Sequence, residues 1–185
     1  MKVLLDFNLV ITTQRGNERN CIRELSRLVG EAGGPRIHMK KTRFPGLLLG
    51  FVEGDPIELC RKIRPFVEED PWDLRFVQKV IPIQKTVPAD AASIKEVVSG
   101  LAGLIPEKSS FKITVNKRGT EISSMELIKQ VATAVQRRVD LNRPDMIIQL
   151  ELIDDRAGIS LIVDDDIVSV TKMQEKAMEG EASKD

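Results

Sequence analysis

The spacing of apolar residues in the first half of the chain predicts four strands and two helices. Cys21, Leu25 and Leu28 recur at the spacing of one helical face, and Asp55 followed by Pro56 is a typical helix start. The pattern predicts strands at residues 2–13, 36–42, 47–52 and 74–83, and helices that begin near residues 17 and 56. The order βαββαβ is the ferredoxin-like arrangement, and we assign residues 1–84 to such a domain.

The second half of the chain follows a different order, αβαββ. Ser123 and Glu126 have the spacing of a capping box, so a helix is expected from there to about Val139. The other predicted elements are a helix at 90–104 and strands at 111–117, 146–153 and 159–163. We therefore expect an α+β protein whose second domain covers residues 85–165. Residues 166–185 are expected to form an acidic tail, as a frayed helix or a disordered segment.

The composition is typical of a soluble globular protein, since 42% of the 185 residues are hydrophobic and 30% are charged. Two cysteines and one histidine are too few for a metal-ligand cluster, and they favour a reducing, cytoplasmic location. No segment approaches the roughly 18 apolar residues that a membrane helix needs, and the N-terminus is read as a strand rather than a signal peptide. Glycine-rich phosphate loops, HExxH and CxxC are absent, so we expect no metal, no cofactor and no catalytic residues.

A formal net charge of zero hides an uneven distribution of charge. Residues 110–144 contain seven cations and three anions, a net charge of +4, whereas residues 164–185 contain three cations and seven anions, a net charge of −4. Charge runs are usually solvated surface, but a basic segment followed by an acidic tail also fits a protein that holds a polyanion. The tail is then expected either to cover the basic surface or to dock a partner.

The strand predicted at 111–117 carries its polar residues on one face. Side chains alternate along a strand, so Lys112, Asn116 and Arg118 share the face opposite the apolar residues. On the helix predicted next, Lys129 and Arg137 fall opposite the apolar stripe. Neighbouring surfaces of like charge repel each other, and a bound polyanion would relieve that repulsion.

Several short elements of the second half occur in the order typical of a THUMP domain. They are Lys117-Arg118-Gly119, Val139-Asp140-Leu141, Asn142-Arg143-Pro144-Asp145 and Leu150-Glu151-Leu152, the last of which departs conservatively from the Val-Glu-Ile of the family. The segment 75–83 resembles the strand that precedes THUMP domains. The resemblance covers residues 1 to about 165, because a ferredoxin-like domain precedes THUMP in tRNA-modifying enzymes.

The resemblance implies that the chain binds the acceptor end and 3′ CCA tail of tRNA, while a separate domain or protein carries the chemistry. About twenty residues follow the resemblance, too few for a catalytic domain, so the chain is most similar to stand-alone, Tan-type adaptors that help an acetyltransferase form N4-acetylcytidine. It is then not an enzyme, and its partners are tRNA and that acetyltransferase. The residues expected to contact phosphates, as one continuous track, are Lys112, Asn116, Lys117, Arg118, Lys129, Arg137, Arg143 and, from the first domain, Arg43.

Other interpretations stay open at this point. The chain could be the non-catalytic half of another split tRNA-modifying enzyme, for thiolation or methylation. It could also be a small enzyme with a pocket between its domains, although no nucleophile, base and metal set stands out in the sequence. A structural oligomer without any RNA is a third interpretation, which the charge asymmetry disfavours.

Several residues that invite a functional interpretation have simpler structural ones. Arg27–Ala32 matches the RxxGxA string of acetyltransferases, but it lies at the end of a predicted helix, where backbone N–H groups are already bonded. The other structural assignments are His38 to a hairpin surface, Cys21 and Cys60 to the core, Trp72 to packing between the two halves, Asp154-Asp155 to a turn, and Asp164-Asp165-Asp166 to an exposed acidic end.

Overall fold

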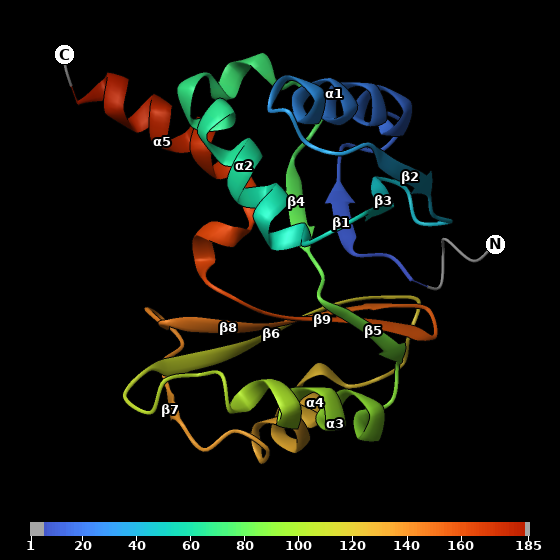
Figure 1. Cartoon of the computed structure of the whole chain (residues 1–185), viewed down its shortest axis with the longest axis vertical. Helices are drawn as coiled ribbons and strands as arrows, with labels where there is room; N and C mark the ends of the chain where they lie inside the picture. The colour runs from blue at the N-terminus through green and yellow to red at the C-terminus, as the bar shows by residue number, and fades with distance from the viewer. Residues whose placement is uncertain (1–5, 184–185) are drawn as a thin grey trace. The chain divides into compact units, whose positions relative to one another are not determined.

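A computed structural model describes residues 6–183 of the chain, which divide into two compact units (Figure 1). The split unit contains Phe7–Pro82 together with residues 165–183, and the central unit contains Asp6 and Ile83–Asp164. The expected α+β class is confirmed, because the described residues form five α-helices and two five-stranded sheets. None of these helices is both long enough and apolar enough to cross a membrane.

The split unit is built on an antiparallel sheet. Its strands are β1 (Leu9–Thr12), β2 (Ile37–Lys41), β3 (Leu47–Val52), β4 (Lys79–Pro82) and β10 (Val168–Ser169), in the order β10-β4-β1-β3-β2. The sheet packs with two helices, α1 (Glu18–Glu31) and α2 (Pro56–Glu69), whose Leu25 and Ile63 are 0% exposed in the shared core. The first four strands and these helices follow the βαββαβ order predicted from the sequence.

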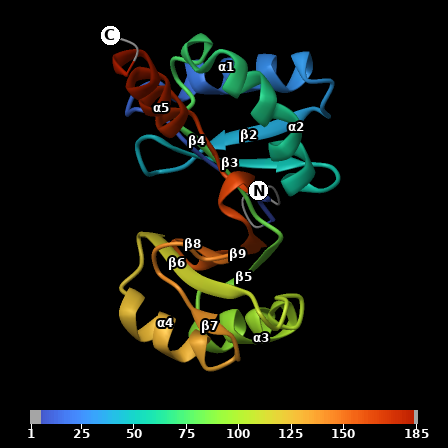
Figure 2. The same ribbon diagram turned by 90° about the vertical axis from the view of Figure 1, so that its left-hand side faces the viewer.

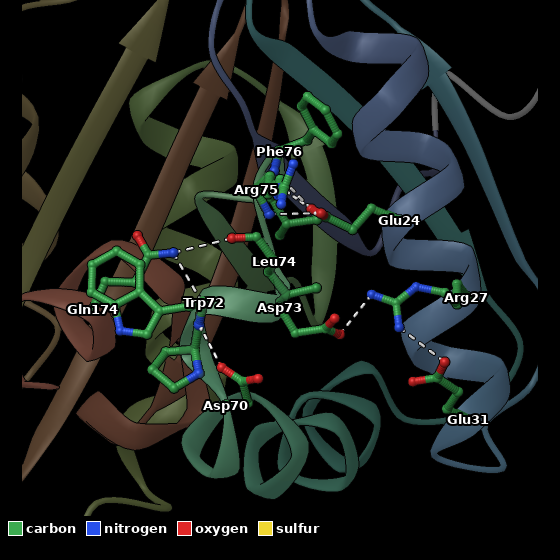
Figure 3. A network of polar contacts seen from close by, with 12 residues as sticks. Glu24, Arg27, Glu31, Asp70, Trp72, Asp73, Leu74, Arg75, Phe76 and Gln174 are labelled. Carbon is green, nitrogen blue, oxygen red and sulfur yellow. Dashed lines mark hydrogen bonds and ion pairs between the residues drawn. The ribbon is translucent and has the colours of Figure 1, made fainter.

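Residues 74–78 do not form the strand that the sequence pattern predicts, because a carboxylate takes up their backbone N–H groups. Glu24 on α1 is 9% exposed and accepts the N–H groups of Arg75, Phe76 and Val77 at 2.7, 2.9 and 2.7 Å (Figure 3). A strand would need those donors for its neighbours in the sheet. As a result β4 begins five residues later than residue 74.

Residues 165–183 are part of the split unit, although the sequence pattern predicted a frayed or disordered tail. Here β10 pairs antiparallel with β4, and α5 (Val170–Ala182) follows it directly. Val168, Val170 and Met173 are 0%, 1% and 9% exposed and join the core beneath α2. These three buried residues lie in a charged stretch and give too weak a period to predict this packing from sequence.

The central unit has its own sheet, with helices on one face. Its strands are β5 (Lys85–Pro88), β6 (Ser110–Arg118), β7 (Arg138–Val139), β8 (Met146–Ile153) and β9 (Arg156–Ile162), in the order β5-β9-β8-β6-β7. β6 runs parallel to β7 and β8, and the other pairs are antiparallel. α3 (Ala91–Ala102) and α4 (Ser124–Ala132) lie on the same side of this sheet (Figure 1 and Figure 2). The sequence pattern missed the short strands β5 and β7.

Three of the four predicted helix starts are confirmed by side-chain caps, whereas Asn17 before α1 makes no side-chain cap hydrogen bond. The side chains of Asp55, Asp90 and Ser123 each accept a backbone N–H from the first turn of α2, α3 and α4, at 2.8, 2.7 and 3.3 Å. Local hydrogen-bonding chemistry of this kind depends only on neighbours in sequence, which is why the sequence predicts it well.

Helix α4 is shorter than predicted and ends at Ala132 rather than near Val139. Beyond it, residues 138–139 pair with the start of β6 as β7, and the N–H of Asp140 extends this ladder to the carbonyl of Phe111 at 3.0 Å. Strand pairing with a distant segment has overridden the helical period of the local sequence.

Two aspartates hold the loop between β7 and β8 against the start of β6. Asp140 accepts the N–H groups of Asn142 and Arg143 at 3.0 and 2.9 Å, and Asp145 accepts the N–H and the hydroxyl of Ser110 at 2.8 and 3.1 Å. The N–H of Arg143 lowers the pKa of Asp140, and the N–H of Ser110 lowers the pKa of Asp145. Both carboxylates are therefore stabilised in their charged form by the backbone.

The packing of α5 is tested by two methionines on that helix. Met173→Ala should lower the free energy of unfolding by about 2 kcal/mol, because it removes a buried side chain from the core. The matched control Met178→Ala removes a side chain that is 58% exposed and should change stability by less than about 0.5 kcal/mol. Urea unfolding followed by the fluorescence of Trp72, in the same unit, measures both. Equal effects would contradict the packing of α5.

The clasp between Asp145 and Ser110 is tested by hydrogen exchange. Asp145→Ala should speed exchange of the Ser110 amide at pH 7 by about tenfold, because the N–H loses its acceptor. Since folding lowers the pKa of Asp145, the stabilisation is complete above the unfolded pKa near 4 and is lost as the pH falls through the folded value. Protection factors of the two proteins should therefore converge as the pH falls through the lowered pKa of Asp145. A pH-independent difference would contradict a role for the carboxylate charge.

Candidate nucleic-acid interface

The polar face predicted for β6 is present in the central unit. Val115 packs into the core with α3 and α4, so Lys112, Asn116 and Arg118 lie on the opposite face of the sheet. The side-chain amide of Asn116 donates to Glu151 on the neighbouring strand at 2.8 Å. Asn116 is therefore engaged within the sheet, and the cations of this face are Lys112, which is half-buried, and Arg118, which is exposed.

Lys117 and Arg118 lie at the C-terminal end of β6. Both are exposed, and their side chains leave the strand on opposite faces. The ammonium of Lys117 donates to the carbonyl of Ile122 at 2.8 Å, which holds it toward the start of α4. The carbonyl of Arg118 accepts the N–H of Asp154 at 2.9 Å, which fixes the backbone beneath its side chain.

Arg137, Arg138 and Arg143, which we call the β7 cluster, lie at the other end of β6. Arg138 pairs in register with Ser110, the first residue of β6. Arg138 and Arg143 are exposed, and both contribute to lowering the pKa of Asp140, after the hydrogen bonds that this carboxylate accepts from the backbone. The two guanidinium groups therefore flank one carboxylate.

Arg137 and Lys129 do not share a helical face, because α4 ends before Arg137. Arg137 instead donates from Nε to the carbonyls of Ile105 and Pro106 at 3.0 and 3.2 Å, and it is half-buried. Lys129 lies in the last turn of α4, 3.9 Å from Glu126, with both side chains exposed. An exposed pair of this kind contributes little to stability, so the Lys129 charge is accessible to a ligand.

The cations that the sequence predicts as one continuous track form two groups in the central unit. The Lys117–Arg118 pair and the β7 cluster lie at opposite ends of β6, roughly 25 Å apart at about 3.3 Å per residue. Arg138 is not in the predicted set, because on a helix continued to Val139 it would lie at the edge of the apolar stripe. Its strand pairing with β6 places it in the β7 cluster.

A second basic surface lies at the β2 edge of the split unit. Residues 14–45 contain eight cations and three anions, a net charge of +5 with His38 neutral. All eight cations are exposed, and Arg27 pairs with Glu31 and Asp73. The other seven lie on α1, β2 and the adjoining loops, and we call them the α1/β2 basic face: Arg15, Arg19, Arg23, Arg36, Lys40, Lys41 and Arg43. Only Arg43, which also stacks on the ring of Phe44 at 4.3 Å, belonged to the predicted set. The run of cations is visible in the sequence, but the predicted set does not include it.

The three anions of residues 14–45 are all engaged elsewhere. Glu18 is 9% exposed and accepts the N–H of Gly46 at 2.8 Å, a bond that lowers the pKa of its carboxyl. Glu24 binds the backbone of the segment that precedes β4, and Glu31 pairs with Arg27 at 2.9 Å (Figure 3). The cations of the α1/β2 basic face other than Arg43, which stacks on Phe44, therefore keep their donors available to a ligand.

The opposite side of the split unit is acidic. Residues 53–73 contain seven anions and three cations, a net charge of −4, and residues 165–183 contain five anions and two cations, a net charge of −3. The guanidinium of Arg61 is held by Asp166 at 2.7 Å, and this carboxylate raises the pKa of Arg61. The split unit is thus polarised between its basic β2 edge and the acidic side formed by α2 and α5.

The structure locates the other residues that could suggest chemistry. The RxxGxA string at Arg27–Ala32 lies at the C-terminal end of α1, where the N–H groups are bonded within the helix. Cys21 and Cys60 are buried; burial raises the pKa of Cys21 to about 12 and also raises that of Cys60. His38 is exposed and Trp72 is 50% exposed. Within residues 6–183 no group of three His, Cys, Asp or Glu side chains could hold a metal ion.

Comparison with known proteins identifies the central unit. The family model for the THUMP domain matches residues 88–162, and no curated protein sequence matches the chain. Similar solved structures include TrmN from Thermus thermophilus (18% identity, TM-score 0.54) and PH1313 from Pyrococcus horikoshii Ot3 (14%, 0.58). Another is a 4-thiouridine synthetase–RNA complex with bound ATP (15%, 0.51).

These similarities cover 83%, 85% and 88% of this chain but only 44%, 55% and 42% of the three solved chains, in the same order. The chain therefore spans about half the length of the structures it resembles. The family match runs from the last residue of β5 to the last residue of β9. It includes the β7 cluster and the Asn142-Arg143-Pro144-Asp145 loop on which the sequence resemblance rests. The chain thus contains a THUMP domain, which residues 88–162 form within the central unit.

Proposed function

We propose that the chain is an accessory protein that binds tRNA and presents its acceptor end and 3′ CCA tail to a separate modifying enzyme. The observation that carries this proposal is the arrangement of the exposed cations. In both units, carboxylates near these cations are held by backbone N–H groups, and the ion pair of Lys129 with Glu126 is exposed. Exposed groups such as those of Arg138, Arg143, Lys40 and Lys41 are therefore available to the phosphates of a nucleic acid.

Contacts from Lys and Arg to phosphates would supply the affinity, and they carry no sequence information. Selectivity for tRNA would come from the shape of the acceptor stem and from its unpaired 3′ end. The two cationic groups of the THUMP domain, separated along β6, fit an elongated ligand better than a compact one. An acceptor stem continued by a single-stranded tail is such a ligand.

For the partner enzyme we propose an acetyltransferase that forms N4-acetylcytidine, as in the Tan-type adaptors that the sequence resembles. The fold is also shared with a 4-thiouridine synthetase and with methylases. An accessory role in thiolation or methylation is accordingly the alternative. It differs from the acetylation role only in which modifying enzyme the chain stimulates.

The salt dependence of tRNA binding tests the cationic surfaces. Arg138→Ala with Arg143→Ala, and separately Lys40→Ala with Lys41→Ala, should each weaken binding and flatten the slope of log K against log salt. The expected change is about 1.4 to 1.8, because each lost phosphate contact removes about 0.7 to 0.9 from the slope. Filter binding of a tRNA transcript between 50 and 300 mM salt measures it.

The matched control is Lys172→Ala with Lys176→Ala, which removes the same charge from α5 on the acidic side. This control should leave the slope unchanged within about 0.3. If all three double variants change the slope equally, tRNA responds to net charge alone, and the proposed surfaces are not its binding site.

The accessory role is tested by reconstitution with acetyl-CoA, a tRNA transcript and a tRNA acetyltransferase from the same organism. The purified chain alone should leave the tRNA unmodified. Adding it to the acetyltransferase at low tRNA concentration should raise N4-acetylcytidine formation by at least about tenfold, because binding raises the local concentration of substrate. Acetylation, thiolation or methylation by the chain alone would contradict the accessory role.

A further inference from the structure

A groove of about 460 Å³ lies on the acidic side of the split unit, between the end of α2, the short helix η2 (Pro71–Asp73) and α5. Its apolar lining includes Trp72, Met173 and Ala177. Trp72 is 50% exposed, although a tryptophan side chain normally buries most of its large apolar surface. Exposed tryptophans in shaped pockets are typical anchors of protein–protein interfaces.

The rim of this groove carries a net negative charge. Arg64 and Glu68 also line it, but they neutralise each other through an ion pair at 2.7 Å. The remaining charged residues of the rim, with a net charge of −2, are Glu69, Asp70, Lys176 and Glu181.

The walls of the groove are held in place by hydrogen bonds. Asp70 accepts the N–H of Trp72 at 3.1 Å, and Gln174 on α5 donates to the carbonyls of Pro71 and Leu74 at 2.9 and 3.1 Å (Figure 3). These contacts join η2 to α5, so the groove is preformed. A preformed site spares a ligand the entropy of ordering it.

We propose that this groove docks a basic segment of a partner protein, with an apolar side chain packed on Trp72 and Lys or Arg side chains facing the acidic rim. Charge complementarity favours a basic segment, because the acidic rim attracts positive side chains and repels negative ones. RNA phosphates would be repelled by the rim and by the net charge of −3 over residues 165–183.

This docking proposal rests on the proposed function in one respect, the identity of the partner, which is the modifying enzyme. The β2 edge and the β10 edge are the two ends of one five-stranded sheet, about 19 Å apart at roughly 4.8 Å per strand. A protein on the α2 and α5 side thus leaves the α1/β2 basic face open. RNA and enzyme are then held together without competing for one surface.

Trp72 is the only tryptophan of the chain, so its fluorescence reports on the groove directly. The probe is a tryptophan-free amphipathic peptide of Lys and Leu, about 20 residues long. Titrating it into the full chain should shift the emission of Trp72 to the blue, because the indole leaves water. The same peptide with Glu in place of Lys, and a tRNA transcript, should leave the emission unchanged. A shift with tRNA, or with both peptides equally, would overturn the proposal.

Two charge-reversed variants locate the binding. Glu69→Lys with Glu181→Lys on the rim should weaken binding of the Lys peptide by at least about tenfold. Glu107→Lys with Glu121→Lys, at exposed positions in the central unit, makes the same change in net charge and should alter binding by less than about twofold. Unchanged thermal unfolding confirms that both variants fold. Equal weakening would show that the peptide follows net charge and does not occupy the groove.

A second arm separates this proposal from the proposed function. The rim variant should bind tRNA like the wild type but should lose its stimulation of the acetyltransferase. If the wild type does not stimulate the acetyltransferase, the proposed partner is wrong. The peptide titration still decides whether the groove binds a basic segment. If the rim variant stimulates fully, enzyme docking at the groove is overturned. Sedimentation of the chain alone should show a monomer, and a dimer abolished by the rim variant would assign the groove to a second copy.

Discussion

The charge pattern of this protein depends on carboxylates that bind backbone N–H groups. A carboxylate accepting such bonds is stabilised in its charged form, and it is held at the backbone and not at the end of a neighbouring cation's side chain. Glu18 and Glu24 do this in the split unit, and Asp140 and Asp145 do it in the THUMP domain. The same bonds close the hairpin, hold the segment before β4 and clasp the β7–β8 loop. The same hydrogen bonds thus stabilise the fold and hold these carboxylates at the backbone.

A chain with no formal net charge can in this way present surfaces of opposite sign. The β2 edge of the split unit is basic. The side formed by α2 and α5 is acidic, because Asp166 pairs with Arg61 and the other carboxylates of that side are exposed. Such a distribution steers ligands as well as holding them, since a phosphate backbone is attracted to one side and repelled from the other. The packing of α5 also keeps the acidic residues on their own side, which is unlike a tail that covers the basic surface.

The sequence predicts the parts of this structure that depend on near neighbours. The caps at Asp55, Asp90 and Ser123 and the alternation along β6 needed only local chemistry, and all are present. The sequence pattern failed where pairing with a distant segment decides the structure. β7 replaces the end of a predicted helix. α5 packs on a core built from much earlier residues, and its Gln174 bonds to Leu74, 100 residues before it. The candidate site followed the same rule. Strand alternation placed three polar residues correctly, whereas the availability of the α1/β2 cations depends on carboxylates whose partners only the fold reveals.

The most direct test of the account is lysine footprinting of the full chain with and without a tRNA transcript, with acylation of each lysine read by mass spectrometry. Lysines on both sides of the split unit are exposed in the protein alone, so each has a measurable rate. The account predicts that tRNA protects Lys40 and Lys41 while Lys172 and Lys176 react as before. Protection of the α5 lysines, or equal protection on both sides, would contradict a polarised protein that holds RNA by its basic surfaces.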